Sequence, residues 1–187
     1  FFIISYLVHK IVSSGSFLIK NSLFDNDKWI TYSDILPDGS CFYHSVLFAI
    51  SKSYRESDNK TRVTMANDMR KVLYDYTTYD LWKKSYSGFC TYDKLKHNLL
   101  YEWAGNVEWK VMSDYLGIQI IILRDIDKSL YWGFDAENGA QPTKKVILIL
   151  NKNDNHFEPI LYDKKYKYQY TFHLSESLYN ILKKNQM

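Results

Sequence analysis

Residues 37–50 read PDGSCFYHSVLFAI, a turn that passes directly into an apolar segment. The Pro-Asp-Gly start is typical of turns, so we expect an irregular loop over 31–40. Apolar residues then recur at helical spacing, which predicts a buried helix that begins at or near Cys41. The inward face of this helix is expected to contain Phe42, Val46, Ala49 and Ile50. The segment therefore places one cysteine at the junction of a loop and a buried helix.

Cys41 lies where a protein can activate a thiol. The first turn of a helix carries partial positive charge and unpaired backbone N–H groups, and both favour a thiolate. Gly39 allows the preceding loop to fold tightly, so the N–H groups around Ser40 and Cys41 are candidates for binding an oxyanion. A cysteine taken alone is more often a small buried apolar side chain. The Asp-Gly-Ser sequence before Cys41 favours the catalytic interpretation.

A cysteine nucleophile needs a base, and His156 is the candidate among the five histidines. It follows a polar loop at 151–155 and opens an apolar strand, where a side chain is both exposed and rigidly held. Because side chains alternate along a strand, Glu158 shares a face with His156 and is a candidate to orient the imidazole. Asp38 is a second candidate acid. The simpler interpretations are a solvated surface pair for His156 and Glu158, and a loop-shaping role for Asp38.

Two other residues, His44 and Cys90, have the same side chains as the candidate base and the candidate nucleophile. His44 follows Cys41 by one helical turn, and we expect it to frame the cleft or to pack. Cys90 has no base within local reach and is interpreted as a structural or idle thiol.

Three more helices are predicted between the loop and residue 117. The first is capped by Asp58 or Asn59, the second follows it along the chain, and the third starts after the break at 104–106 and ends at Gly117. Their expected inward residues are Met65, Met69, Val72, Leu73 and Tyr76, then Leu95, Leu99 and Trp103, then Val107, Val111, Tyr115 and Leu116.

The rest of the chain predicts strands. Residues 118–123 form an apolar run suited to a strand that is buried on both faces. Further strands are expected at 130–134, 146–150, 156–162 and, at an edge, 164–172, before a terminal helix at 174–182. The expected fold class is α+β, with a mixed sheet sandwiched between helices.

Length and composition bound the remaining possibilities. A chain of 187 residues suits one domain, and we expect residues 31–187 to form it with 1–30 as an N-terminal arm or accessory lobe. Because the chain starts with Phe1 instead of Met, we expect it to be part of a longer protein. The apolar stretch 1–8 is too short to span a membrane, so no membrane partner is expected.

Charge and cysteine usage exclude several classes of site. The net charge of +3 comes from 24 basic and 21 acidic residues without a basic stripe, which disfavours nucleic-acid binding. The two cysteines form no Cys-x-x-Cys pair, which disfavours a zinc site and a multi-disulfide scaffold. We expect no metal site and no cofactor. The two cysteines also fit a reducing compartment.

Three short segments occur in an informative order. They are residues 38–45 (DGSCFYHS), residues 102–109 (EWAGNVEW) followed by YLGI at 115–118, and residues 155–160 (NHFEPI). They resemble the Asp-Gly-x-Cys run, the Trp-Gly-x-x-x-Glu helix and the His-aromatic-x-x-aliphatic block of the ovarian tumour (OTU) family of deubiquitinating cysteine proteases. Each match is weak alone, but their order and spacing together make coincidence improbable.

The resemblance implies a papain-like OTU fold and a protease that hydrolyses the bond between the C-terminal glycine of ubiquitin and a lysine. On this chain the nucleophile of the family falls on Cys41, its base on His156 and its loop acid on Asp38. The family commonly has Asp or Asn two residues after the histidine, where this chain has Glu158. The resemblance therefore leaves both Glu158 and Asp38 open as the residue that orients His156.

The partners implied are ubiquitin or polyubiquitin, with ubiquitin-like modifiers as further substrates. We expect a monomer that works in the cytoplasm, or in the host cytosol if it is a viral or bacterial effector. The alternative is a catalytically silent OTU-like module that binds ubiquitin. A basic nucleic-acid binder is a third hypothesis, and it predicts binding that weakens steeply with salt.

Overall fold

The computed structural model describes residues 16–18, 29–127, 129–132, 145–164, 167–173 and 178. The helices of this part are α2 (Cys41–Ile50), α3 (Lys52–Glu56), α4 (Asn59–Tyr76), α5 (Tyr79–Ser85), α6 (Tyr92–Tyr101) and α7 (Asn106–Leu116). Its strands are β1 (Ser16–Leu18), β2 (Trp29–Tyr32), β3 (Gln119–Arg124), β4 (Leu130–Trp132), β5 (Lys145–Lys152), β6 (His156–Asp163), β7 (Tyr168–Gln169) and β8 (Phe172–His173).

The described strands form one mixed sheet. Its order is β1-β2-β6-β5-β3-β4, with β7 paired to β6 and β8 paired to β5. Strands β3 and β5 run parallel, while the other pairs are antiparallel. The α+β class and the mixed sheet are therefore confirmed.

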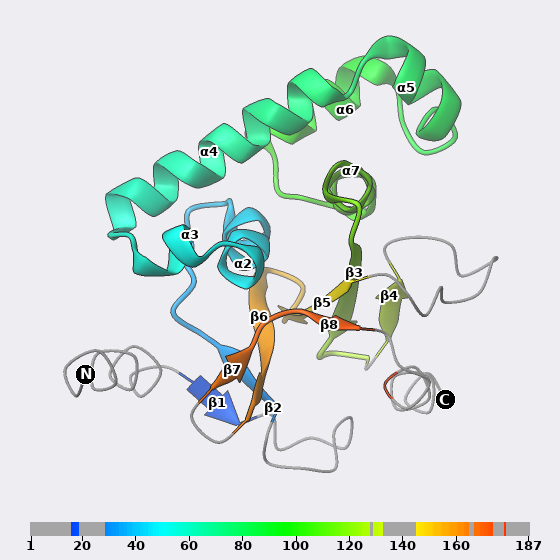
Figure 1. Cartoon of the computed structure of the whole chain (residues 1–187). Coiled ribbons are helices and arrows are strands. Elements are labelled where there is room, and N and C mark those ends of the chain that lie inside the picture. The colour runs from blue at the N-terminus through cyan, green and yellow to red at the C-terminus, as the bar shows by residue number, and fades with distance from the viewer. Residues whose placement is uncertain are drawn as a thin grey trace.

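The described helices lie on one side of the sheet (Figure 1). Helix α2 packs against β5 and β6, and α7 packs against β3. Helix α4 crosses over α2 and α7, and together with α5 and α6 it forms an arm that extends away from the sheet (Figure 1). The opposite face has its own apolar cluster, which includes Leu178. Apart from Leu178, the predicted terminal helix at 174–182 lies outside the described residues.

Strand β3 is buried on both faces, as its sequence predicts. Ile120 and Ile122 contact the helix-side core, while Ile121 and Leu123 contact the cluster on the opposite face. In the described sheet β3 lies between β5 and the edge strand β4, and its two faces contribute to the two apolar clusters.

The predicted inward face of α4 is partly wrong. Leu73 is buried and Met65, Met69 and Tyr76 pack at the edge of the core, but Val72 is 38% exposed. The face that points inward instead contains Arg62, Ala66, Arg70 and Leu73. Apolar periodicity missed the two arginines because their guanidinium groups are satisfied by backbone carbonyls inside the fold.

Other boundaries also differ from the predictions. Trp103 follows α6 instead of belonging to it and is 57% exposed, and Tyr115 on α7 is 40% exposed. Helix α7 is packed from two sides, so its buried set is broader than one stripe and includes polar residues. The irregular loop starts at residue 33 instead of 31, because Thr31 and Tyr32 belong to β2. The short helices α3 and α5 were not predicted.

Most of the predicted N-terminal arm lies outside the described residues. The parts that are described, β1 and the start of β2, are strands of the same sheet. Among the described helices, none is long and apolar enough to cross a membrane.

Candidate active site

Cys41 is the first residue of α2, as predicted. The loop before it turns at Gly39, whose φ of +83° is a conformation that side chains disfavour. The Ser40 N–H donates to the Asp38 carboxylate at 2.9 Å, and the Ser40 carbonyl accepts the first hydrogen bond of the helix at 2.9 Å. Because the Ser40 N–H already donates to Asp38, the N–H of Cys41 is the better-placed oxyanion donor at this junction.

The thiol of Cys41 is set against the start of β6. Burial raises its pKa, while hydrogen bonds from the backbone of Phe157, Phe42 and Cys41 itself favour the thiolate. The sulfur therefore lies beside the backbone of the residue that follows His156. Since burial is the largest effect, the resting sulfur is a thiol that must lose its proton during attack.

Helix α2 is fastened to β6 at the same point. The Ser45 hydroxyl donates to the Phe157 carbonyl at 2.8 Å. The rings of Phe42, Trp109 and Phe157 pack with centroid separations of 5.6–6.2 Å. These three rings come from the three segments that resemble OTU motifs, so the fold brings those segments together at one junction.

His156 opens β6 opposite Lys152 on β5. Burial lowers its pKa, Glu158 raises it and Lys152 lowers it. Glu158 is 2% exposed and its carboxylate accepts from Lys152 Nζ at 3.2 Å. Within the described part of the chain, the His156 imidazole makes no hydrogen bond, to Glu158 or to any other residue. The neutral imidazole is therefore favoured, as a general base requires.

Asp38 is engaged by a different histidine. His44 is fully buried, its Nε2–H donates to the Asp38 carboxylate at 3.0 Å, and its Nδ1 accepts from the Tyr54 hydroxyl at 2.6 Å. Both ring nitrogens of His44 are thus occupied, and its ring packs beneath the loop, as expected. His44 holds the Asp38 loop in place and is not free to act as a base toward Cys41. Tyr54, on the unpredicted helix α3, could not be found from the sequence.

Arg70 on α4 clamps the cysteine loop. Its guanidinium donates to the Gly39 carbonyl at 2.9 Å, to Ser40 Oγ at 3.0 Å, and to the carbonyls of Leu99 and Glu102 at 3.1 and 3.0 Å. It also lies over the Tyr43 ring at 4.2 Å. The side chain is only 5% exposed. Arg70 therefore joins the loop before Cys41 to the arm formed by α4, α5 and α6, a role that no local pattern in the sequence signals.

The other thiol and histidines of the described chain lie elsewhere. Cys90 is half-buried, and burial raises its pKa. His97 lies on α6 beside Glu102, and His173 is on the exposed end of β8. No group of His, Cys, Asp and Glu suited to a metal ion occurs among the described residues.

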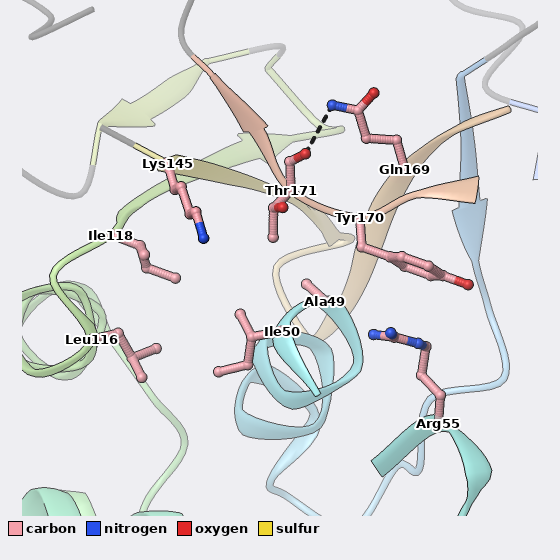
Figure 2. Close-up of a pocket in the computed structure, with 9 residues that line it drawn as sticks. All are labelled: Ala49, Ile50, Arg55, Leu116, Ile118, Lys145, Gln169, Tyr170 and Thr171. Atoms are coloured by element: carbon pink, nitrogen blue, oxygen red, sulfur yellow. Dashed lines mark hydrogen bonds between the residues drawn. The ribbon is translucent and has the colours of Figure 1, made fainter. Parts of the chain in front are cut away.

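A cavity of about 490 Å³ lies at the opposite end of α2 (Figure 2). Ile50, Leu116 and Ile118 form its apolar side, and Lys145 points into it (Figure 2). Arg55 lies 4.0 Å from the Tyr170 ring centroid and donates to the Phe48 carbonyl at 2.6 Å, which places a positive charge at the C-terminal end of α2. None of the predicted site residues lines this cavity.

The sequence finds no match among models of protein families and none among curated proteins. Solved structures do match, 22 chains in all. An OTU domain in complex with ubiquitin superposes with a TM-score of 0.60 at 17% identity, over 92% of this chain and 90% of that one. An OTU deubiquitinase from Wolbachia pipientis wMel gives 0.51 at 15% identity, over 83% of this chain and 96% of that one.

A viral OTU domain protease from Dera Ghazi Khan virus gives a TM-score of 0.52 at 18% identity, over 81% of this chain and 88% of that one. The chain therefore has the OTU fold, which confirms the fold that the three segments implied.

Proposed function

We propose that the chain is a thiol-dependent deubiquitinase of the OTU family, which hydrolyses isopeptide bonds at the C-terminal glycine of ubiquitin. The observation that carries the proposal is the junction of α2 with β6: α2 begins at Cys41, β6 begins at His156, and the Ser45 hydroxyl and the Phe42 ring of α2 both contact Phe157. The OTU fold supports it, as do similar structures described as proteases or as complexes with ubiquitin.

The proposed reaction starts from a protonated Cys41 thiol and a neutral His156 imidazole. His156 takes the proton of Cys41 as the sulfur attacks the glycine carbonyl, and the carbonyl oxygen gains negative charge near the Cys41 N–H. The His156 imidazolium then gives its proton to the departing lysine amine, leaving a thioester between Cys41 and the glycine. Water, deprotonated by His156, attacks the thioester and releases the ubiquitin carboxylate and the free thiol.

Glu158 is the acid that we assign to His156. It lies on the same face of β6 and raises the pKa of the imidazole, so it stabilises the imidazolium that forms during the reaction. Asp38 is engaged by His44 and Ser40, and its role is to hold the cysteine loop.

The test of the proposal is incubation with a panel of diubiquitins of different linkage. We expect at least one linkage to be cleaved to monoubiquitin, with cleavage stopped by alkylation of Cys41. A silent ubiquitin-binding module would instead bind ubiquitin and leave every diubiquitin intact. Failure both to bind and to cleave any of them would refute the proposal.

The pH dependence of the reaction is a further prediction. Activity requires neutral His156, and burial lowers its pKa below the ordinary value of 6.5, so the acid limb of kcat/KM should have its midpoint below 6.5. Glu158→Gln removes a charge that raises this pKa and should move the limb to lower pH. Lys152→Gln removes a charge that lowers it and should move the limb to higher pH.

The measurement is kcat/KM against pH with a fluorogenic ubiquitin substrate. Lys52→Gln is the matched control, because Lys52 is an exposed lysine on α3 and its loss should leave the limb in place. Shifts of the same sign for Glu158→Gln and Lys152→Gln would contradict the assignment of the limb to His156.

A further inference from the structure

The hairpin that carries His156 has an unusual backbone. Three residues, 153–155, separate Lys152 from His156 in the β5–β6 ladder. Asn153 and Asp154 both adopt left-handed conformations, with φ of 53° and 56°. Asn and Asp tolerate this region better than other non-glycine residues, but at a cost. Two consecutive residues of this kind persist only where the surroundings hold them.

The turn after β3 supplies that support. The Arg124 guanidinium donates to both carboxylate oxygens of Asp154, at 2.8 and 2.5 Å, and to Asp127 at 2.8 Å. Asp125 accepts from the Asn153 N–H at 2.8 Å. Arg124 ends β3, which is packed on both faces, and the bidentate pair fixes direction as well as distance, so the hairpin tip is tied to a strand that is itself firmly packed.

We propose that Arg124 and Asp154 are positioning residues for the catalytic base, which hold the backbone from which His156 projects. This inference rests on the proposed function. The imidazole makes no hydrogen bond to the residues that the structure describes, so its place depends on its backbone and packing. Asp154 is two residues before His156, and a small misplacement of a catalytic group lowers kcat strongly. Neither Arg124 nor Asp154 is expected to touch ubiquitin or the reacting atoms.

A purely structural role makes a different prediction. Arg124 and Asp154 are partly exposed, and exposed ion pairs contribute little to global stability. If the pair only closed a surface turn, its loss would leave kcat unchanged. A positioning role lowers kcat while KM and the unfolding transition stay close to wild type.

The experiment compares Arg124→Gln, Asp154→Asn and the double variant. Asn tolerates the left-handed backbone, so Asp154→Asn removes the charge without adding strain at residue 154. We expect each single variant to lower kcat on a fluorogenic ubiquitin substrate by about tenfold or more with KM unchanged. The double variant should be no slower than the slower single one, because all three remove the same interaction.

The control is the exposed pair Asp68 and Lys71 on α4, changed to Asn and Gln, which should leave kcat as it is. Amide hydrogen exchange over 152–157 and the NMR shifts of the His156 imidazole are recorded for the same variants. Faster exchange and a shifted imidazole support the proposal, and wild-type values of kcat, exchange and shift in Arg124→Gln would overturn it. If the wild-type protein is inactive toward ubiquitin, the proposed function is refuted but the present proposal is not. Amide hydrogen exchange and the NMR shifts of the imidazole still decide whether Arg124 and Asp154 position His156.

Discussion

Cys41→Ala is expected to lower kcat for hydrolysis of a ubiquitin conjugate by about 10⁴-fold or more, the range seen when a catalytic nucleophile is removed. The reason is specific to this fold. Among the described residues, Cys41 supplies the thiol beside the Phe157 backbone, and the other described cysteine, Cys90, is on the arm. The same change should abolish covalent labelling by a ubiquitin derivative that carries a C-terminal electrophile.

The matched control is Cys90→Ala, which removes the second thiol and should keep labelling and kcat at wild-type levels. Circular dichroism and thermal unfolding of Cys41→Ala should match wild type, because alanine fits the space of the small side chain. Labelling that survives in Cys41→Ala and disappears in Cys90→Ala would show that the nucleophile is misassigned. Ubiquitin binding without labelling in the wild type would support the silent binding module instead.

Arg70→Met is expected to lower the free energy of unfolding by about 3–5 kcal/mol, because it removes several hydrogen bonds made by a buried charged group. Methionine keeps the length of the side chain, so the loss is mainly polar. The carbonyls of Gly39, Leu99 and Glu102 would lose this donor, and Tyr43 would lose its cation–π partner. Because Gly39 belongs to the loop that precedes Cys41, the remaining folded protein should also react more slowly at Cys41.

Urea unfolding monitored by tryptophan fluorescence measures this change. Lys71→Met is the control on the next residue of α4, where the lysine is exposed, and its effect should stay within about 0.5 kcal/mol. Arg70→Lys should recover only part of the loss, because one ammonium group cannot reproduce the planar fork of the guanidinium. Equal unfolding midpoints for Arg70→Met and Lys71→Met would disprove the clamp.

Local patterns in the chain predicted much of the fold. The turn before Cys41, the helix after it and the doubly buried strand β3 each follow from turn chemistry or apolar periodicity within about ten residues. The predictions failed where burial depends on distant partners. Val72 and Tyr115 fit an apolar stripe but face outward, whereas Arg70 breaks the stripe and is buried. No local pattern shows which carbonyls will surround a guanidinium.

The candidate site also has a part that the sequence predicted and a part that it did not. Cys41, His156 and Glu158 were selected from residue type and strand alternation, and the fold sets Cys41 beside the Phe157 backbone. The partner of Asp38 was not predictable, because it is His44 held by Tyr54 on a helix that the sequence did not indicate. The ion pair between Arg124 and Asp154 in the His156 hairpin was also not predictable, because the two residues are brought together by the pairing of β3 with β5.

The sequence by itself determined most of the longer helices and strands and the chemically capable residues, because turn residues, apolar spacing and strand alternation act over a few neighbours. Only the tertiary structure decided which charges are buried, which acid serves which histidine, and what holds the two halves of the site together. Several of those choices depend on contacts between distant segments, such as Arg70 with Ser40 and Ser45 with Phe157. The pairing of Asp38 with His44 depends on how the loop and α2 pack against α3. Such contacts form only when the sheet and helices pack, so no local pattern of residues encodes them.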